Sequence, residues 1–191
     1  MLAAKPMTTD SDTNAKQWRT VQYEVHMLLA ALNLLGCYGS HTELEKLRVV
    51  RDSRVEVPKK TTDLPFVFRN GITELAVLHA RILIDILISR GDKPDDISLD
   101  KLLPDCDPVG IKALEDAYFY DDDDKRHEKK RGESENTPCW QFNKHLAHAT
   151  TNRGEGHDYS SALKKVLDPI VRILESIKKK RPCFDLNLPS D

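Results

Sequence analysis

The sequence contains few aromatic residues and no closely spaced cysteines. Only 6% of its 191 residues are Phe, Trp or Tyr. Its four cysteines stand far apart, and none belongs to a CxxC pair. This usage is typical of reduced thiols in a cytoplasmic protein. The first 13 residues also lack the apolar core that a secretory signal needs, so a cytoplasmic location is predicted.

Long apolar runs and an excess of one charge are missing as well. The longest apolar stretch, 75–88, is interrupted by His79, Arg81 and Asp85. It is shorter than the ~20 residues that a bilayer span requires, so no membrane association is expected. The net charge is −2, with Lys and Arg spread along the chain. That balance argues against a dedicated nucleic-acid binder, so no DNA partner is expected, although it leaves room for a small basic pocket.

Familiar catalytic motifs do not occur. The chain has no GxGxxG, GxSxG, P-loop or HExxH sequence, which excludes the commonest enzyme classes. Cys139, His145, His148 and His157 lack the overall spacing of a metal site. The consecutive carboxylates 121–124 would repel one another and stay solvated in a loop. Neither a metal nor a cofactor is therefore predicted.

Helical periodicity is what the sequence does contain. Trp18, Val21, Val25 and Leu28 follow one another in steps of three and four, which places them on one helix face. Similar patterns recur along the chain, and no stretch shows sustained strand alternation. The sequence therefore predicts an all-α, antiparallel four- to five-helix bundle. Its expected helices are 16–36, 65–89, 108–119, 138–150 and 158–178.

The domain boundaries follow from the same pattern. We expect a disordered N-terminus, one helical domain with a charged projecting loop, and a loose C-terminal tail. These segments are 1–15, 16–178 with its loop 121–137, and 179–191. Asp107 is a plausible N-cap before Pro108. Pro169 should kink or restart the last helix.

A further short helix is predicted after the first long one. Ser40 stands three residues before Glu43, which is the spacing of a capping box. Leu44, Leu47 and Val50 then follow at helical spacing.

The expected helix 65–89 carries a narrow polar stripe on an otherwise apolar surface. Glu74, Arg81 and Asp85 fall in this stripe at 100° per residue. Arg81 and Asp85 are also an i, i+4 pair, which explains them without a function if they are exposed. The alternative is a polar pocket between helices, as bundles build from facing side chains. His79 falls among the apolar residues and is better explained as a hydrogen-bonded core histidine than as a ligand.

A second group of polar side chains lies in 139–153. Lys144 and His148 are i and i+4, so they share a helix face, and Asn143 and Arg153 stand close in sequence. A neighbouring Lys disfavours the imidazolium form, which leaves a neutral His able to act as a base. An exposed polar face without a function is the alternative interpretation.

These polar residues together resemble a known family. The resemblance rests on Glu74, His79-Ala80-Arg81, Asp85, Asp95-Asp96-Ile97, Asn143-Lys144, His148 and Arg153. In this pattern the chain is similar to uncharacterised bacterial HEPN-like helical proteins of toxin and phage-defence systems. The resemblance covers 66–178. It implies a four- or five-helix bundle, often dimeric, and in many members a metal-independent ribonuclease.

The family's active motif is an Arg followed four to six residues later by a His. His148 matches that His, but Asn143 stands where the Arg is expected. Lys144 offers a charge there without the planar fork of Arg. The resemblance thus favours a non-catalytic module that binds RNA, a nucleotide or a protein partner, and it implies a homodimer.

Two other functional hypotheses stay open. One is an endoribonuclease in which His148 is general acid or base, Asn143 orients the scissile group, and Lys144 and Arg153 stabilise phosphate charge. The other is a homodimeric interaction protein without a small-molecule site. The binding and catalytic hypotheses both require that the Glu74–Arg81–Asp85 stripe and the Lys144–His148 face open onto one shared cavity.

Overall fold

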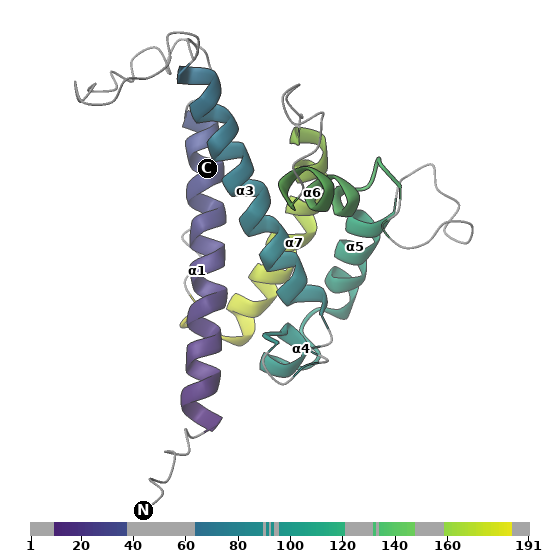
Figure 1. Ribbon diagram of the computed structural model, residues 1–191. Coiled ribbons are helices and arrows are strands. Elements are labelled where there is room, and N and C mark those ends of the chain that lie inside the picture. Colours follow the sequence, from purple (N-terminus) through teal and green to yellow (C-terminus); the bar gives the residue numbers. More distant parts are fainter. Residues whose placement is uncertain are drawn as a thin grey trace, which may run out of the picture.

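Figure 1 shows the computed structural model of the chain, in which every element is a helix. The structure describes residues 10–37, 64–89, 91, 93, 96–120, 132, 134–147 and 159–184. Within these ranges there are six α-helices and no strand, so the predicted all-α class is confirmed. The helices are α1 (Asp10–Cys37), α3 (Leu64–Ile88), α4 (Leu99–Leu102), α5 (Pro108–Phe119), α6 (Pro138–Ala147) and α7 (Ser160–Lys180).

Helix α3 is the central element of the bundle. It contacts α1, α4, α5, α6 and α7, which agrees with its apolar character around most of its circumference. Figure 1 shows α1 at one edge of the molecule with α3 beside it and α5 and α6 on the other side of α3, while α7 crosses behind α3 with its C-terminal end towards α1. The fully buried side chains come from every long helix and form one core. They include Val25, Leu83, Leu114, Phe142 and Ile173.

Four of the chain's few aromatic residues gather where α5, α6 and α7 meet. The Tyr118 ring lies 4.8 Å from Phe119 and 6.1 Å from Phe142, measured between ring centroids. Phe142 is in turn 6.4 Å from Tyr159, just before α7. Tilted and edge-on arrangements at these distances are the favourable ones for aromatic pairs. This aromatic group therefore fixes α6 against both neighbouring helices.

Helix α1 starts earlier than expected. It begins at Asp10, so residues 10–15 are helical and the prediction of disorder over 1–15 was wrong for them. The side chains of residues 12–16 are exposed, and they gain nothing from burial. Extending an existing helix fixes one residue per hydrogen bond, which costs far less than starting a new one. The helix from Trp18 onward is stabilised by packing, so it can extend at little cost into the polar residues that precede Trp18.

The C-terminal segment is also better ordered than expected. Lys179 and Lys180 complete α7, and Phe184 is buried with its ring 5.7 Å from that of Trp18. The Arg181 guanidinium lies 4.7 Å from the Trp18 ring centre, and Lys178 Nζ donates to the Phe184 carbonyl at 2.7 Å. The predicted loose tail over 179–191 was therefore wrong for 179–184. Burial of one large aromatic side chain holds the segment against α1.

Two predicted local features can be compared directly with the structure. Asp107 is the N-cap of α5 and Pro108 follows at its first turn, as expected. Pro169 lies inside α7, which continues through it from Ser160 to Lys180, so the helix does not restart there. The predicted short helix after Ser40 lies outside the described residues.

The end of the expected charged loop 121–137 belongs to the packed domain. Thr137 is buried, and its Oγ1 accepts from the Trp140 backbone N–H at 3.2 Å, which caps α6. The Gly132 N–H donates to the Phe119 carbonyl at 3.1 Å. Gly132 has φ +76°, and a Cβ there would lie 2.9 Å from Cys139 Sγ. This turn returns the chain from α5 to α6 at close range.

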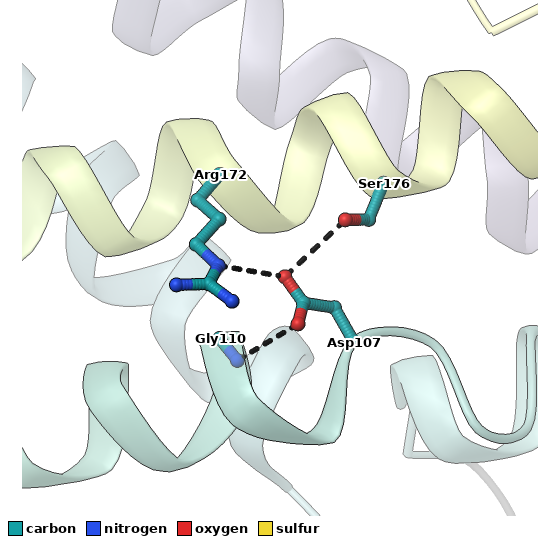
Figure 2. Close-up of polar contacts among 4 residues, drawn as sticks. All are labelled: Asp107, Gly110, Arg172 and Ser176. Carbon is teal, nitrogen blue, oxygen red and sulfur yellow. Dashed lines mark hydrogen bonds and ion pairs between the residues drawn. The ribbon is translucent and has the colours of Figure 1, made fainter.

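Asp107 caps the N-terminus of α5 and also connects α5 to α7. Figure 2 shows its carboxylate accepting from the Gly110 N–H at 2.9 Å, from Arg172 Nε at 3.2 Å and from Ser176 Oγ at 3.2 Å. Burial alone would raise the pKa of this carboxyl, but the hydrogen bonds and the Arg172 charge outweigh it and lower the pKa. The Asp107 clasp (Asp107, Gly110, Arg172 and Ser176) thereby sets the position of α5.

Candidate functional site

The polar stripe of α3 lies on its outer side, where the helix turns away from the core. Arg81 and Glu74 are half-buried and Asp85 is exposed, whereas the residues around them on the inner faces are fully buried. Glu74 stands seven residues before Arg81, so it lies about 10 Å further along the helix. The part of the stripe nearest to other polar groups is therefore the Arg81–Asp85 pair.

Tyr118 of α5 connects this pair to α6. Its ring is buried, and its hydroxyl shares a hydrogen bond with the Cys139 thiol at the start of α6. The charges of Asp85 and Arg81 both act on the phenol. Burial, Cys139 and Asp85 raise the pKa of Tyr118 far above its usual value, and Arg81 opposes them. The hydroxyl therefore keeps its proton at every physiological pH and remains a hydrogen-bond donor.

Helix α6 adds an amide and an ammonium group. Asn143 is half-buried, and its Nδ2 donates to Cys139 Sγ at 3.4 Å. The next residue, Lys144, is exposed. We call Arg81, Asp85, Tyr118, Cys139 and Asn143 the three-helix polar cluster, because its members come from α3, α5 and α6.

The pKa of Asp85 is raised in the folded protein. The loss of hydration around its carboxylate raises its pKa above the ordinary value, and the attraction of Arg81 only partly opposes this. The side chain as a whole remains exposed.

The cluster combines donors of several kinds within one region. Arg81 provides a planar guanidinium suited to phosphate or carboxylate oxygens. Asn143 provides a neutral donor through its second amide hydrogen, and Lys144 stands next to it on α6. Such a set can bind an oxyanion through charge-assisted and neutral hydrogen bonds.

Only some of the site residues predicted from the sequence come together in the structure. Arg81, Asp85 and Asn143 belong to the cluster, Lys144 follows it on α6, and Glu74 lies farther along α3. His148 and Arg153 lie outside the described residues, so their predicted placement, and the cavity shared with His148, stay predictions.

His79 does not belong to the cluster. Its Nδ1 lies 2.7 Å from Glu24 Oε2, and both side chains are buried between α1 and α3. A carboxylate can only accept, so Nδ1 carries the proton of this hydrogen bond. The interpretation of His79 as a satisfied core histidine is confirmed.

Tyr118 was not predicted as a site residue, and Cys139 has a different role from the one considered for it. Cys139 was considered only as a metal ligand, and it is instead the neighbour of both Tyr118 and Asn143. Tyr118 stands four residues after Leu114 on the inner face of α5, which is a detectable signal. An inward tyrosine needs a partner for its hydroxyl, so this position indicates a polar neighbour in the core.

Over the part of the chain that the structure describes, no group of three or more His, Cys, Asp or Glu side chains is arranged to hold a metal ion. No described helix is long and apolar enough to cross a membrane. Comparison with known proteins gave no match to a family model, to a curated protein or to a solved structure.

Proposed function

We propose that this protein is a HEPN-like helical module that binds a phosphate-bearing ligand, a nucleotide or RNA, without cleaving it. The observation that carries the proposal is the convergence of Arg81, Tyr118 and Asn143 from three helices. Bundles commonly build ligand sites from side chains on facing helices in this manner. The HEPN-like assignment rests on the sequence resemblance.

The donors favour a phosphate over a cation. Arg81 supplies charge together with two parallel N–H groups, which match two phosphate oxygens. Tyr118 cannot ionise near neutral pH, because burial raises its pKa, so it adds no negative charge beside Arg81. Lys144 is exposed beside Asn143 and can reach a second phosphate without first losing a buried partner.

The histidines with described side chains lie away from the cluster, and the candidate base His148 lies outside the described residues. Metal-independent cleavage of RNA needs a general base near the phosphate. Of the two histidine side chains that the structure describes, His79 is bonded to Glu24, and His26 lies on α1, 2.9 Å from Gln22. Neither adjoins the three-helix polar cluster.

The test measures binding to the whole chain by thermal stabilisation and by fluorescence titration. The probes are adenosine and guanosine nucleotides and a single-stranded RNA of about ten bases. Arg81→Gln and Lys144→Ala should each weaken binding by roughly 10-fold, which is the loss of one charge-assisted hydrogen bond. Lys164→Ala, an exposed lysine on α7, is the matched control and should bind as the unchanged protein does. No binding of any probe would overturn the proposal and favour the interaction protein.

The ribonuclease alternative makes a separate prediction. In the sequence His148 stands four residues after Lys144, which is the spacing of residues that share a helix face. If His148 is a general base, expression in bacteria should arrest growth, and His148→Ala should relieve the arrest. Incubation of the purified protein with RNA should then show cleavage that the same substitution abolishes. We expect neither arrest nor cleavage.

A further inference from the structure

The two tryptophans of the chain lie in different surroundings. Trp18 on α1 is 5% exposed, with its ring against Phe184 and under the Arg181 guanidinium. Trp140 on α6 is only half-buried. Phe142 anchors α6 in the core, and Trp140 lies about 160° round the helix from it. The core therefore accounts for Trp18, whereas Trp140 stands on the side of α6 that faces away from Phe142.

Trp140 adjoins the three-helix polar cluster. It follows Cys139, whose thiol shares a hydrogen bond with the Tyr118 hydroxyl. On α6, Cys139 and Asn143 form one i, i+4 pair, and Trp140 and Lys144 form a second pair one residue further along. The two pairs are about 100° apart round the helix, so they lie side by side. The surface of α6 thus continues from the cluster, past Asn143, to Trp140 and Lys144.

The backbone that carries Trp140 is held in place by the capping residue of α6. The buried Thr137 hydroxyl accepts from the Trp140 N–H at 3.2 Å and donates to the Ser134 carbonyl at 2.7 Å. The next residue, Gln141, donates through its N–H to the Thr137 carbonyl at 3.1 Å and through Nε2 to the Glu135 carbonyl at 3.2 Å. A tryptophan has few rotatable bonds, and here its backbone is fixed. A ligand that stacks on the ring therefore costs little conformational entropy.

The spacing along α6 suits a ligand with a phosphate at one end and a flat ring at the other. Trp140 and Lys144 are four residues apart, which is about 6 Å along the helix axis. A nucleotide separates its phosphate from its base by one sugar, so its phosphate can lie at Lys144 and Asn143 while its base lies on Trp140. Stacking on an aromatic face is available to every base, because every base has a π-face. A phosphate chain without a base cannot use Trp140.

We infer that Trp140 is the base-stacking residue of the proposed phosphate site, and that it makes the site selective for nucleotides and single-stranded RNA over phosphates that carry no base. The inference rests on the proposed function, since the phosphate is what the three-helix polar cluster and Lys144 hold. Aromatic side chains stack on bases that are not already stacked in a duplex. Double-stranded RNA should therefore bind more weakly than a single strand of the same length.

The first experiment compares adenosine triphosphate with inorganic tripolyphosphate, its counterpart without a nucleoside, by calorimetric titration of the full chain. The nucleotide should bind at least about 10-fold more tightly, which is the contribution of one stacked base. Trp140→Ala should reduce this preference by about 10-fold, and Trp140→Phe, which keeps an aromatic ring, should retain most of it. Tyr23→Ala is the matched control, because it removes a 54%-exposed aromatic side chain from α1 and should leave the preference unchanged.

The second experiment uses tryptophan fluorescence, since stacking on a base quenches indole emission. Adenosine triphosphate and the single-stranded RNA probe should quench the unchanged protein, and tripolyphosphate should not. In Trp140→Phe the remaining emission comes from the buried Trp18 and should not respond to the nucleotide. In Trp18→Phe the emission comes from Trp140 alone, so the quenched fraction should be larger than in the unchanged protein. A purely structural role for Trp140 would produce none of these differences.

The base-stacking role and the proposed phosphate site fail in different ways. Equal affinity for the nucleotide and tripolyphosphate would overturn the inference and leave the phosphate site standing. A preference that survives Trp140→Ala, or quenching that persists in Trp140→Phe, would have the same consequence. Binding of neither compound would overturn the proposed function, and the base-stacking role with it.

Discussion

The contact between α1 and α3 (the α1/α3 seam) and the contact between α5 and α7 (the α5/α7 seam) each include one acidic residue that accepts a hydrogen bond from the neighbouring helix. The surroundings of these two residues differ. Glu24 and His79 are buried together, with an apolar core around them. Asp107 lies at the edge of its seam, where its partner Arg172 is 55% exposed. Water can replace a lost bond at the edge and cannot do so in the core. The same kind of contact should therefore contribute unequally to the two seams.

The largest effect is expected from Glu24→Ala. Removing the carboxylate leaves the buried His79 Nδ1–H without its 2.7 Å acceptor and leaves a cavity, at a cost of about 3 kcal/mol in the free energy of unfolding. Urea denaturation measures the loss. Glu24→Gln keeps an acceptor oxygen and should lose less. If Glu24→Ala cost no more than removal of Asp107, burial would not be what separates the two seams.

Gly110→Ala tests how closely α5 approaches α7. An added Cβ would overlap Asp107 and lie 3.1 Å from Ile173 Cγ1, so the helices must separate and the Asp107 clasp must shift. We expect a loss of about 2 kcal/mol from this overpacking. Gly71→Ala on α3 is the matched control, because nothing lies within 4 Å of its Cβ position. That variant should gain up to ~1 kcal/mol, as alanine favours a helix over glycine.

Asp107→Ala should cost about 1.5 kcal/mol, less than Glu24→Ala. It removes the cap on Gly110 and places alanine at φ +43°, a left-handed conformation that Asp and Asn tolerate better. The exposed Arg172 contact adds little. Asp107→Asn keeps the cap and the backbone tolerance, so it isolates the contribution of the charge.

The charge of Asp107 gives its seam a pH dependence. Its folded-state pKa lies below the ordinary 3.8, so the ionised form stabilises the fold above that pH. This contribution is lost as the pH falls through the lower, folded value. The stability difference between the unchanged protein and Asp107→Asn should be constant near neutral pH and shrink below about 4. A difference that persisted at pH 2 would assign it to geometry rather than charge.

The two seams also show what a sequence can predict. Asp107 was identified as an N-cap because capping depends on neighbours three residues away. Its bonds to Arg172 and Ser176 span 65 and 69 residues, and no local pattern indicates them. His79 was placed in the core from helical spacing alone, but its partner Glu24, 55 residues away, was not identified. The periodicity of a helix predicts which of its faces is buried. It does not predict which polar group of another helix will bond to a buried polar side chain.

The same limit applies to the candidate site. The stripe of Arg81 and Asp85 was visible because α3 is otherwise apolar. Tyr118 was overlooked because an inward aromatic residue looks the same in sequence whether its hydroxyl meets water or a thiol. The packed residues 179–184 were missed for a related reason. A single Phe184 shows no periodicity, although it is buried against Trp18.

The smallest expected effect comes from Asp85, on the exposed side of the central helix, and it has the opposite sign. Burial raises the folded-state pKa of this carboxyl above 3.8, so its ionised form opposes folding at neutral pH. Asp85→Asn should therefore stabilise the protein at pH 7, by no more than about 0.5 kcal/mol because solvent screens an exposed group. The gain should vanish as the pH falls towards 3.8, where the carboxyl is protonated in the folded state. Since the substitution also removes a negative charge beside Arg81, phosphate-bearing probes should bind more tightly. A destabilised Asp85→Asn protein would mean that the Arg81–Asp85 attraction outweighs the lost hydration.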